Sequence, residues 1–199
     1  MQSERKRRFL ENFIISKISN ILRREQMNPN ELMTLPRDAI PETSKTLSEG
    51  DIKFLFRMLI EKDEKLRYNA FLLLQSSSTR SPQVYQYWNE IEDKLSSDNS
   101  YQRSIGIMLI AENVRWDKED RFAKTIGKYL CCCNGEKFIN SRQAIQGLAT
   151  IIKSTNKYDV EIKHCLANFQ FFQYKASQQK LFFRDISSVL EIISSKETE

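Results

Sequence analysis

Apolar residues recur at three- and four-residue spacing along most of the chain, which is the periodicity of an amphipathic helix. From Leu47 onward, short polar turns divide this pattern into eight segments, which we interpret as four helix pairs. The segments are 48–60 with 64–76, 82–95 with 101–113, 118–131 with 140–153, and 159–171 with 177–194. Short connections place successive helices antiparallel and side by side, so the pattern predicts an all-α fold, an α-α superhelix of about four pairs.

Two segments precede these pairs. Residues 4–25 have an amphipathic pattern and predict an extra N-terminal helix. The next segment contains Pro29, Pro36 and Pro41 among polar residues, which predicts a linker. The predicted organisation is a basic amphipathic helix over 1–26, a linker over 27–46 and stacked helix pairs over 47–199.

The second helix of each pair carries a basic residue that recurs at a regular interval. These residues are Arg67, Arg103, Arg142 and Lys180, separated by 36, 39 and 38 positions. Three positions after the first two stand Ala70 and Gly106, which are small enough to let helices approach closely. A recurrence of this length is typical of repeat proteins whose helix pairs are about 40 residues long.

In these features the chain resembles the HEAT-repeat family of armadillo-type α-solenoids. In that family an Asp in the turn and an Arg at the start of the second helix form a ladder of hydrogen bonds between repeats. Asp63 and Asp98 precede an Arg by four and five residues, so the resemblance implies such a ladder here. Its expected members are Asp63, Arg67, Asp98, Arg103 and Arg142.

The resemblance covers residues 47–194 and weakens toward the C-terminus. The third pair has Glu136 in its turn, and the fourth has no turn acid. Residues 97–117 are also similar to small bacterial HEAT-like proteins that are labelled SufBD-like. That label comes from β-helical iron–sulfur assembly proteins, whereas the periodicity here is helical throughout, so we infer no function from it.

No catalytic constellation emerges from the sequence. His164 is the only histidine, and neither a Gly-x-Ser-x-Gly elbow nor a glycine-rich phosphate loop occurs. The cysteines are Cys131, Cys132, Cys133 and Cys165. Adjacent helical positions point about 100° apart, so the triplet cannot converge on one ion, and we expect free thiols without metal or cofactor. The sequence favours a binding protein over an enzyme.

Charge and hydropathy bear on the class of partner. Four units of the net charge of +5 lie in residues 1–25, which leaves the predicted helix pairs nearly neutral. Because a protein that wraps nucleic acid carries positive charge on the wrapping surface, we expect a protein or peptide partner. No run reaches the roughly 18 apolar residues of a membrane span, and no signal peptide is evident. We expect a cytoplasmic protein.

A nucleic-acid alternative remains open, because the HEAT resemblance also admits the alkylpurine DNA glycosylases. There, Trp88 and Trp116 would stack on a damaged base, and Asp117 would stabilise a cationic sugar. In the other interpretation the tryptophans pack between repeats and Asp117 caps the following helix.

A helical wheel locates the expected binding surface. In a HEAT stack the second helices line the concave face, and the first, fifth and eighth positions after each Arg point away from the core. These positions form a row, which comprises Tyr68, Leu72, Gln75, Ser104, Met108, Ala111, Gln143, Gly147 and Thr150. Three of them, Tyr68, Leu72 and Met108, are predicted to bind a peptide or helix. Alternatively, neighbouring repeats or the N-terminal helix cover the row.

Overall fold

The computed structural model describes residues 26–197, so the helix predicted over residues 4–25 lies outside the described residues. Within that range the chain forms helices and no strand, which confirms the all-α prediction for the part described. The α-helices are α2 (Pro29–Thr34), α3 (Ile40–Thr43), α4 (Glu49–Met58), α5 (Glu64–Ser78), α6 (Trp88–Leu95), α7 (Ser100–Asn113), α8 (Phe122–Cys133), α9 (Phe138–Ser154), α10 (Asp159–Ala167) and α11 (Ala176–Glu197). Each of the eight helices expected after Leu47 has a counterpart.

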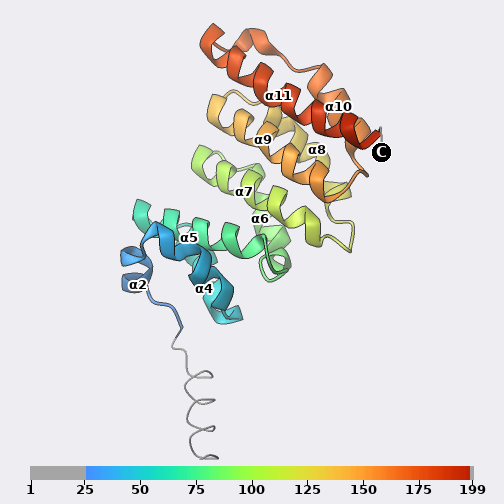
Figure 1. Cartoon of the computed structure of the whole chain (residues 1–199). Helices are drawn as coiled ribbons and strands as arrows, with labels where there is room; N and C mark the ends of the chain where they lie inside the picture. Colours follow the sequence, from blue (N-terminus) through green and yellow to red (C-terminus); the bar gives the residue numbers. More distant parts are fainter. Residues whose placement is uncertain (1–25, 198–199) are drawn as a thin grey trace, which may run out of the picture.

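The helices pack in sequence order (Figure 1). Within pairs, α4 packs on α5, α6 on α7, α8 on α9 and α10 on α11. Between pairs, the second helices follow one another, with α5 against α7, α7 against α9 and α9 against α11. Side-chain hydrogen bonds also cross from one pair to the next, as from Trp88 Nε1 to Thr125 Oγ1 at 3.1 Å and from Asn113 Nδ2 to Ser78 Oγ at 2.9 Å. The partners of these bonds stand 37 and 35 residues apart, about one helix pair.

Residues 27–46 differ from the predicted linker. They fold into α2, α3 and two short 3₁₀ helices, 37–39 and 44–46, and α2 and α3 pack against α5. Leu32 and Ile40 are buried in the core, and Asn69 Nδ2 on α5 donates to the Leu32 carbonyl at 2.7 Å. Two of the prolines lie within the first two positions of α2 and α3, where a missing N–H is tolerated. This segment therefore covers α5 on the side facing away from α7.

The first two arginines of the expected ladder bind turn carbonyls. Arg67 Nη1 donates to the carbonyls of Glu61 and Lys62 at 2.7 and 2.8 Å, and Arg103 Nη1 donates to the carbonyl of Ser97. The turn acids do not accept these bonds. Asp63 caps α5 by accepting from two backbone N–H groups at 2.9 Å.

The cap of α7 is Asn99 rather than the neighbouring Asp98. Asn99 Oδ1 accepts from the backbone N–H groups of Tyr101 and Gln102 at 2.9 and 3.2 Å. Asp98 makes no hydrogen bond or ion pair within residues 26–197. Arg67 and Arg103 therefore bind carbonyls of the turn within their own pair, and the predicted Asp–Arg ladder between repeats does not form at these residues.

The third pair departs from the expected ladder. Arg142 forms an ion pair with Asp185 on α11 at 2.7 Å, instead of binding the turn before it. The hydrogen bond equivalent to that of Arg103 comes from Ser141, whose Oγ donates to the carbonyl of Gly135, six residues earlier, at 2.9 Å. The structural counterpart of Arg103 is therefore Ser141, at a period of 38 residues, and the Arg-based alignment of this pair is one residue out of register.

Replacing Arg103 with Ala removes a charge-assisted bond to the carbonyl that precedes α7. We expect the free energy of unfolding to fall by about 1–2 kcal/mol, because hydrogen bonds to charged groups contribute more than neutral ones. Urea denaturation followed by circular dichroism measures the change. The matched control is Arg57→Ala, at an exposed position on α4, and an equal loss in both variants would contradict the assigned role of Arg103.

Two glycines offer a matched test of helix packing. A Cβ at Gly147 on α9 would lie 2.1 Å from Tyr129 Oη and 3.0 Å from Ala111 Cβ, whereas a Cβ at Gly127 would meet nothing within 4 Å. We expect Gly147→Ala to destabilise the fold by about 1–3 kcal/mol through overpacking. Gly127→Ala should stabilise it by up to about 1 kcal/mol through helix propensity. Thermal unfolding measures both, and the same sign of change in the two variants would contradict this packing.

Candidate partner-binding surfaces

Most of the predicted row lines a groove. The groove has a volume of about 190 Å³ and lies between α5, α7 and α9. Its lining residues are Gln75, Met108, Ala111, Glu112, Gln143, Gln146, Gly147 and Thr150. Six of these belong to the row expected from the helical wheel, including Met108. The wheel is wrong for Ala111 and Ser104, which are buried instead of pointing away from the core.

The other row residues lie outside the groove. Tyr68 and Leu72 stand on α5 before Gln75, and both are half-buried against the core. The guanidinium of Arg37 lies over the Tyr68 ring, 5.1 Å from its centre, so the segment before α4 partly covers this end of the row. Ser104 is buried between α7 and α9, where its Oγ accepts from Asn140 Nδ2 at 2.7 Å.

The floor of the groove is made of small residues. Ala111 is buried, and Gly147 leaves room for the fully buried Tyr129 of α8, whose hydroxyl donates to the Ala144 carbonyl at 3.2 Å. Small residues on facing helices let α7 and α9 approach closely. Tyr129 lies behind Gly147 and supports this floor.

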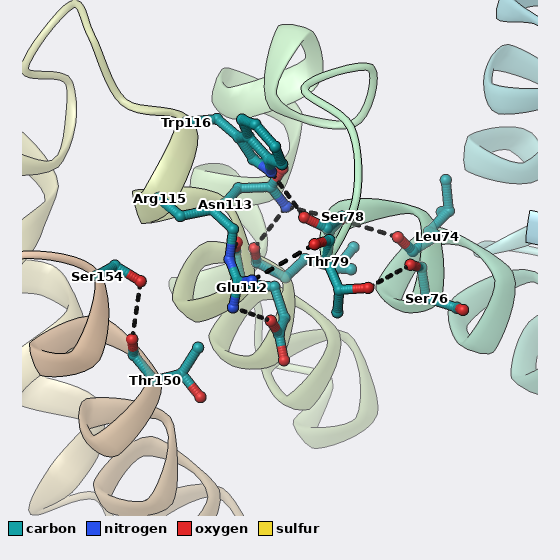
Figure 2. A network of polar contacts seen from close by, with 11 residues as sticks. Leu74, Ser76, Ser78, Thr79, Glu112, Asn113, Arg115, Trp116, Thr150 and Ser154 are labelled. Atoms are coloured by element: carbon teal, nitrogen blue, oxygen red, sulfur yellow. Dashed lines mark hydrogen bonds and ion pairs between the residues drawn. The ribbon is translucent and has the colours of Figure 1, made fainter. Parts of the chain in front are cut away.

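A network of polar contacts joins the C-terminal ends of α5 and α7 and includes the groove residue Glu112 (Figure 2). Asn113 Nδ2 donates to Ser78 Oγ, and Trp116 Nε1 donates to the Ser78 carbonyl at 2.6 Å. Arg115 pairs with Glu112 at 3.0 Å. Burial raises the pKa of the Glu112 carboxyl, and the charge of Arg115 opposes that rise. The single acid in the groove lining is therefore already paired within the protein.

The residues suggested for glycosylase chemistry are used in packing. Trp88 is 1% exposed, and the indole N–H groups of Trp88 and Trp116 both donate to protein acceptors. Asp117 accepts from the backbone N–H groups of Arg121 and Phe122 at 2.9 and 2.7 Å, and so caps α8. It also accepts from the Tyr85 hydroxyl at 2.8 Å, and burial together with this bond raises the pKa of Tyr85 to about 12.

A second hollow, which we name the turn cleft, lies where α8 turns into α9. Its volume is about 510 Å³. The residues that line it are Leu95, Ser96, Arg103, Lys128, Cys131, Cys132, Gly135, Glu136, Lys137 and Asn140. A further cavity of about 480 Å³ shares Glu136, Lys137 and Asn140 with it and extends along the first turns of α7 and α9. The two hollows therefore meet at the N-terminus of α9.

The turn cleft is positively charged. Its lining contains three basic residues, Arg103, Lys128 and Lys137, and one acid, Glu136. Lys128 pairs with Glu92 at 2.6 Å, whereas Lys137 is exposed and has no partner within the described residues. α9 begins at Phe138 without a side-chain cap, and its first intrahelical bond runs from Ser141 N to Lys137 O. The backbone N–H groups of its first turn therefore add partial positive charge.

Asn140 carries an unpaired acceptor at this junction. The residue is 4% exposed, and its Nδ2 donates to Ser100 O and Ser104 Oγ at 2.8 and 2.7 Å. Its Oδ1 is buried and accepts no hydrogen bond within the described residues. An unsatisfied buried carbonyl costs free energy, so it calls for an explanation.

In the second helix pair, the amide oxygen at the position equivalent to Asn140 has a donor. Gln102 stands 38 residues before Asn140, its Nε2 donates to the Leu59 carbonyl at 2.7 Å, and its Oε1 accepts from Lys94 Nζ at 2.6 Å. The residue 38 positions after Lys94 is Cys132, which lines the turn cleft. Where the second pair has a lysine that satisfies the amide, the third has a short thiol and a hollow.

Burial disfavours the thiolate form of Cys132, which lines the turn cleft. Burial raises the pKa of Cys132 to about 11, although the nearby Arg103 acts in the opposite direction. Cys133 is buried, and its pKa is raised by a hydrogen bond with Cys165 and by burial. All four cysteines are free, as expected from the sequence, and within residues 26–197 no cluster of three potential metal ligands occurs.

Sequence reasoning missed the turn cleft. The usable signal was the replacement of Lys94 by Cys132 at one period, but it becomes visible only when the pairs are aligned at 38 residues rather than on Arg142. The unpaired amide of Asn140 gives no sequence signal, because asparagine at such a position is ordinarily bonded.

Comparisons with family models, curated proteins and solved structures found no match for this chain. Among the described residues, no helix is both long and apolar enough to cross a membrane.

Proposed function

We propose that this chain is a non-catalytic scaffold of HEAT-like repeats, an α-solenoid, which binds a protein or peptide partner in the groove between α5, α7 and α9. The observation that carries the proposal is the groove itself, because it gathers most of a row that the repeat pattern predicts. Its lining contains no cation and only one acid, Glu112, which is paired with Arg115.

The repetition of contacts supports the solenoid part of the proposal. Second helices pack in order, and side chains bond to the neighbouring pair at separations of about one repeat. Arg67 and Arg103 bind the turn carbonyls in the same way, six residues before each Arg. Such nearest-neighbour packing is the defining feature of solenoid proteins.

The chemistry of the lining favours a polypeptide in extended or helical form. Gln75, Gln146 and Thr150 offer amide and hydroxyl groups, and Met108 offers an adaptable apolar contact. Gln143 Oε1 is a buried acceptor without a partner in the described residues, and a peptide N–H would satisfy it. A groove without cations suits main-chain hydrogen bonds better than a phosphate backbone. The structural roles of Trp88, Trp116 and Asp117 also count against the glycosylase alternative.

Introducing charge into the groove tests the proposal. Peptides of about 16 residues are selected from a displayed random library on the wild-type protein, and their affinities are measured by fluorescence anisotropy. We expect the double variant Gln75→Lys, Met108→Lys to weaken the binding of the selected peptides by at least about tenfold, because lysine side chains would fill a groove whose lining has no cation. Thermal unfolding should show that the fold is intact.

The control places the same charges away from the groove, on a first helix of a pair. It carries Gln86→Lys and Asn89→Lys at exposed positions near the start of α6. Affinity in this control should stay within about twofold of wild type. Raising salt from 50 to 200 mM should also change peptide affinity little, whereas nucleic-acid binding would fall by orders of magnitude. Failure to select any peptide, or equal losses in both double variants, would contradict the proposal.

A further inference from the structure

We propose that the turn cleft binds the free C-terminal carboxylate of a peptide, held by Lys137, Arg103 and the first-turn N–H groups of α9. In this arrangement the side-chain carbonyl of Asn140 accepts a hydrogen bond from the last N–H of the peptide. The site is distinct from the groove, because it lies at the N-terminal ends of α7 and α9, whereas the groove lies over the C-terminal half of α7 and the middle of α9.

The hydrogen-bond donors of the turn cleft indicate that its ligand carries an anionic group. Within residues 26–197 the only hydrogen bond of the Arg103 guanidinium is to Ser97, which leaves further N–H groups on a side chain that has five. Lys137 is exposed, and α9 has no side-chain cap. A helix N-terminus flanked by two cationic side chains that have no acidic partner within residues 26–197 is suited to a carboxylate or a phosphate.

The donor half of the ligand follows from Asn140. A fully ionised anion, such as a simple carboxylate, brings only acceptors to Asn140 Oδ1, so it leaves this amide oxygen unsatisfied. The C-terminus of a peptide carries an N–H group next to its carboxylate and offers both functions at once. The second pair shows that the fold has room for a donor at this position, because Lys94 Nζ donates to Gln102 Oε1, the equivalent of Asn140 Oδ1, at 2.6 Å.

Size and apolar surroundings are consistent with a short peptide end. The hollows of about 510 and 480 Å³ that meet at α9 fall within the range of ordinary ligand sites. Leu95 contributes a buried apolar wall, and Ile139 is 58% exposed at the entrance of the second hollow. These side chains provide apolar contacts for the last residues of a peptide.

The test uses an array of peptides that are immobilised by their N-termini and randomised over the last four residues. Each sequence is present once with a free C-terminal carboxylate and once as the amide. We expect the full-length protein to bind a subset of the free-carboxylate peptides at least about tenfold more strongly than their amides. Capture of no peptide, or equal capture of both forms, would overturn the proposal.

Three variants connect the capture to the turn cleft. Lys137→Glu should weaken it by at least about tenfold, whereas the control Lys118→Glu, the same charge change in the loop before α8, should not alter it. Cys132→Lys places a lysine where the second pair has Lys94, so the new ammonium should bond Asn140 and abolish capture while the melting temperature holds or rises. Capture that survives both Lys137→Glu and Cys132→Lys would place the peptide elsewhere and refute the assignment.

A phosphate titration separates this ligand from a simple anion. Inorganic phosphate is added while NMR follows the backbone amides of residues 138–140 with and without a captured peptide. Competition between phosphate and peptide supports a shared carboxylate subsite, and phosphate binding without any carboxylate-dependent peptide capture would reduce the cleft to an anion site. The groove variant Gln75→Lys, Met108→Lys should retain this capture, so failure of the groove and failure of the turn cleft are distinguishable.

Discussion

The fold depends on side chains that cross from one helix pair to the neighbouring pair, or to the segment 27–46, and satisfy buried polar groups there. Amides perform this role repeatedly, as when Asn69 reaches the Leu32 carbonyl and Gln102 reaches the Leu59 carbonyl, both at 2.7 Å. An apolar interface alone would let helices slide past one another with little change in buried area. A directed bond to a particular carbonyl fixes the register, because a misplaced pair leaves both donor and acceptor unsatisfied.

Asn140 is a position where this pairing of buried polar groups is incomplete. Asn140 keeps its donor bonds to α7, so the register of α9 is preserved, but its acceptor is unpaired beside the hollow next to Cys132. Filling that hollow with a lysine is within reach of the fold, as Lys94 demonstrates one pair earlier. The third pair thus has a hollow at the position that Lys94 fills in the second pair. This difference between two equivalent positions of one chain is stronger evidence for a ligand than an isolated cavity.

The sequence predicted helix type and pairing well, because periodicity reports directly on which face is buried. The sequence-based predictions were wrong where one residue type can take two structural roles. Prolines in residues 27–46 indicated a linker, yet Pro29 and Pro41 stand at the beginning of short helices, and only packing against α5 decides between the two readings. Arg142 matched the arginines of the other pairs by type, while Ser141 matches them by the bond it makes. The sequence therefore predicted that a side chain bonds the turn, but in the third pair it did not predict which residue does so.

The floor of the groove limits what a partner of the proposed kind could present to it. Gly147 cannot be enlarged without displacing Tyr129, and that tyrosine is fixed by its bond to the Ala144 carbonyl, so the floor does not yield to a protruding side chain. In the proposed complex, binding energy would come from contacts along the length of the groove rather than from one anchoring pocket. Met108 and the amides of Gln75 and Gln143 provide such distributed contacts, with an apolar side chain that adapts its shape and polar groups that pair with a main chain. The geometry consequently favours a partner that lays a continuous backbone across α5, α7 and α9 over one that inserts a single large residue.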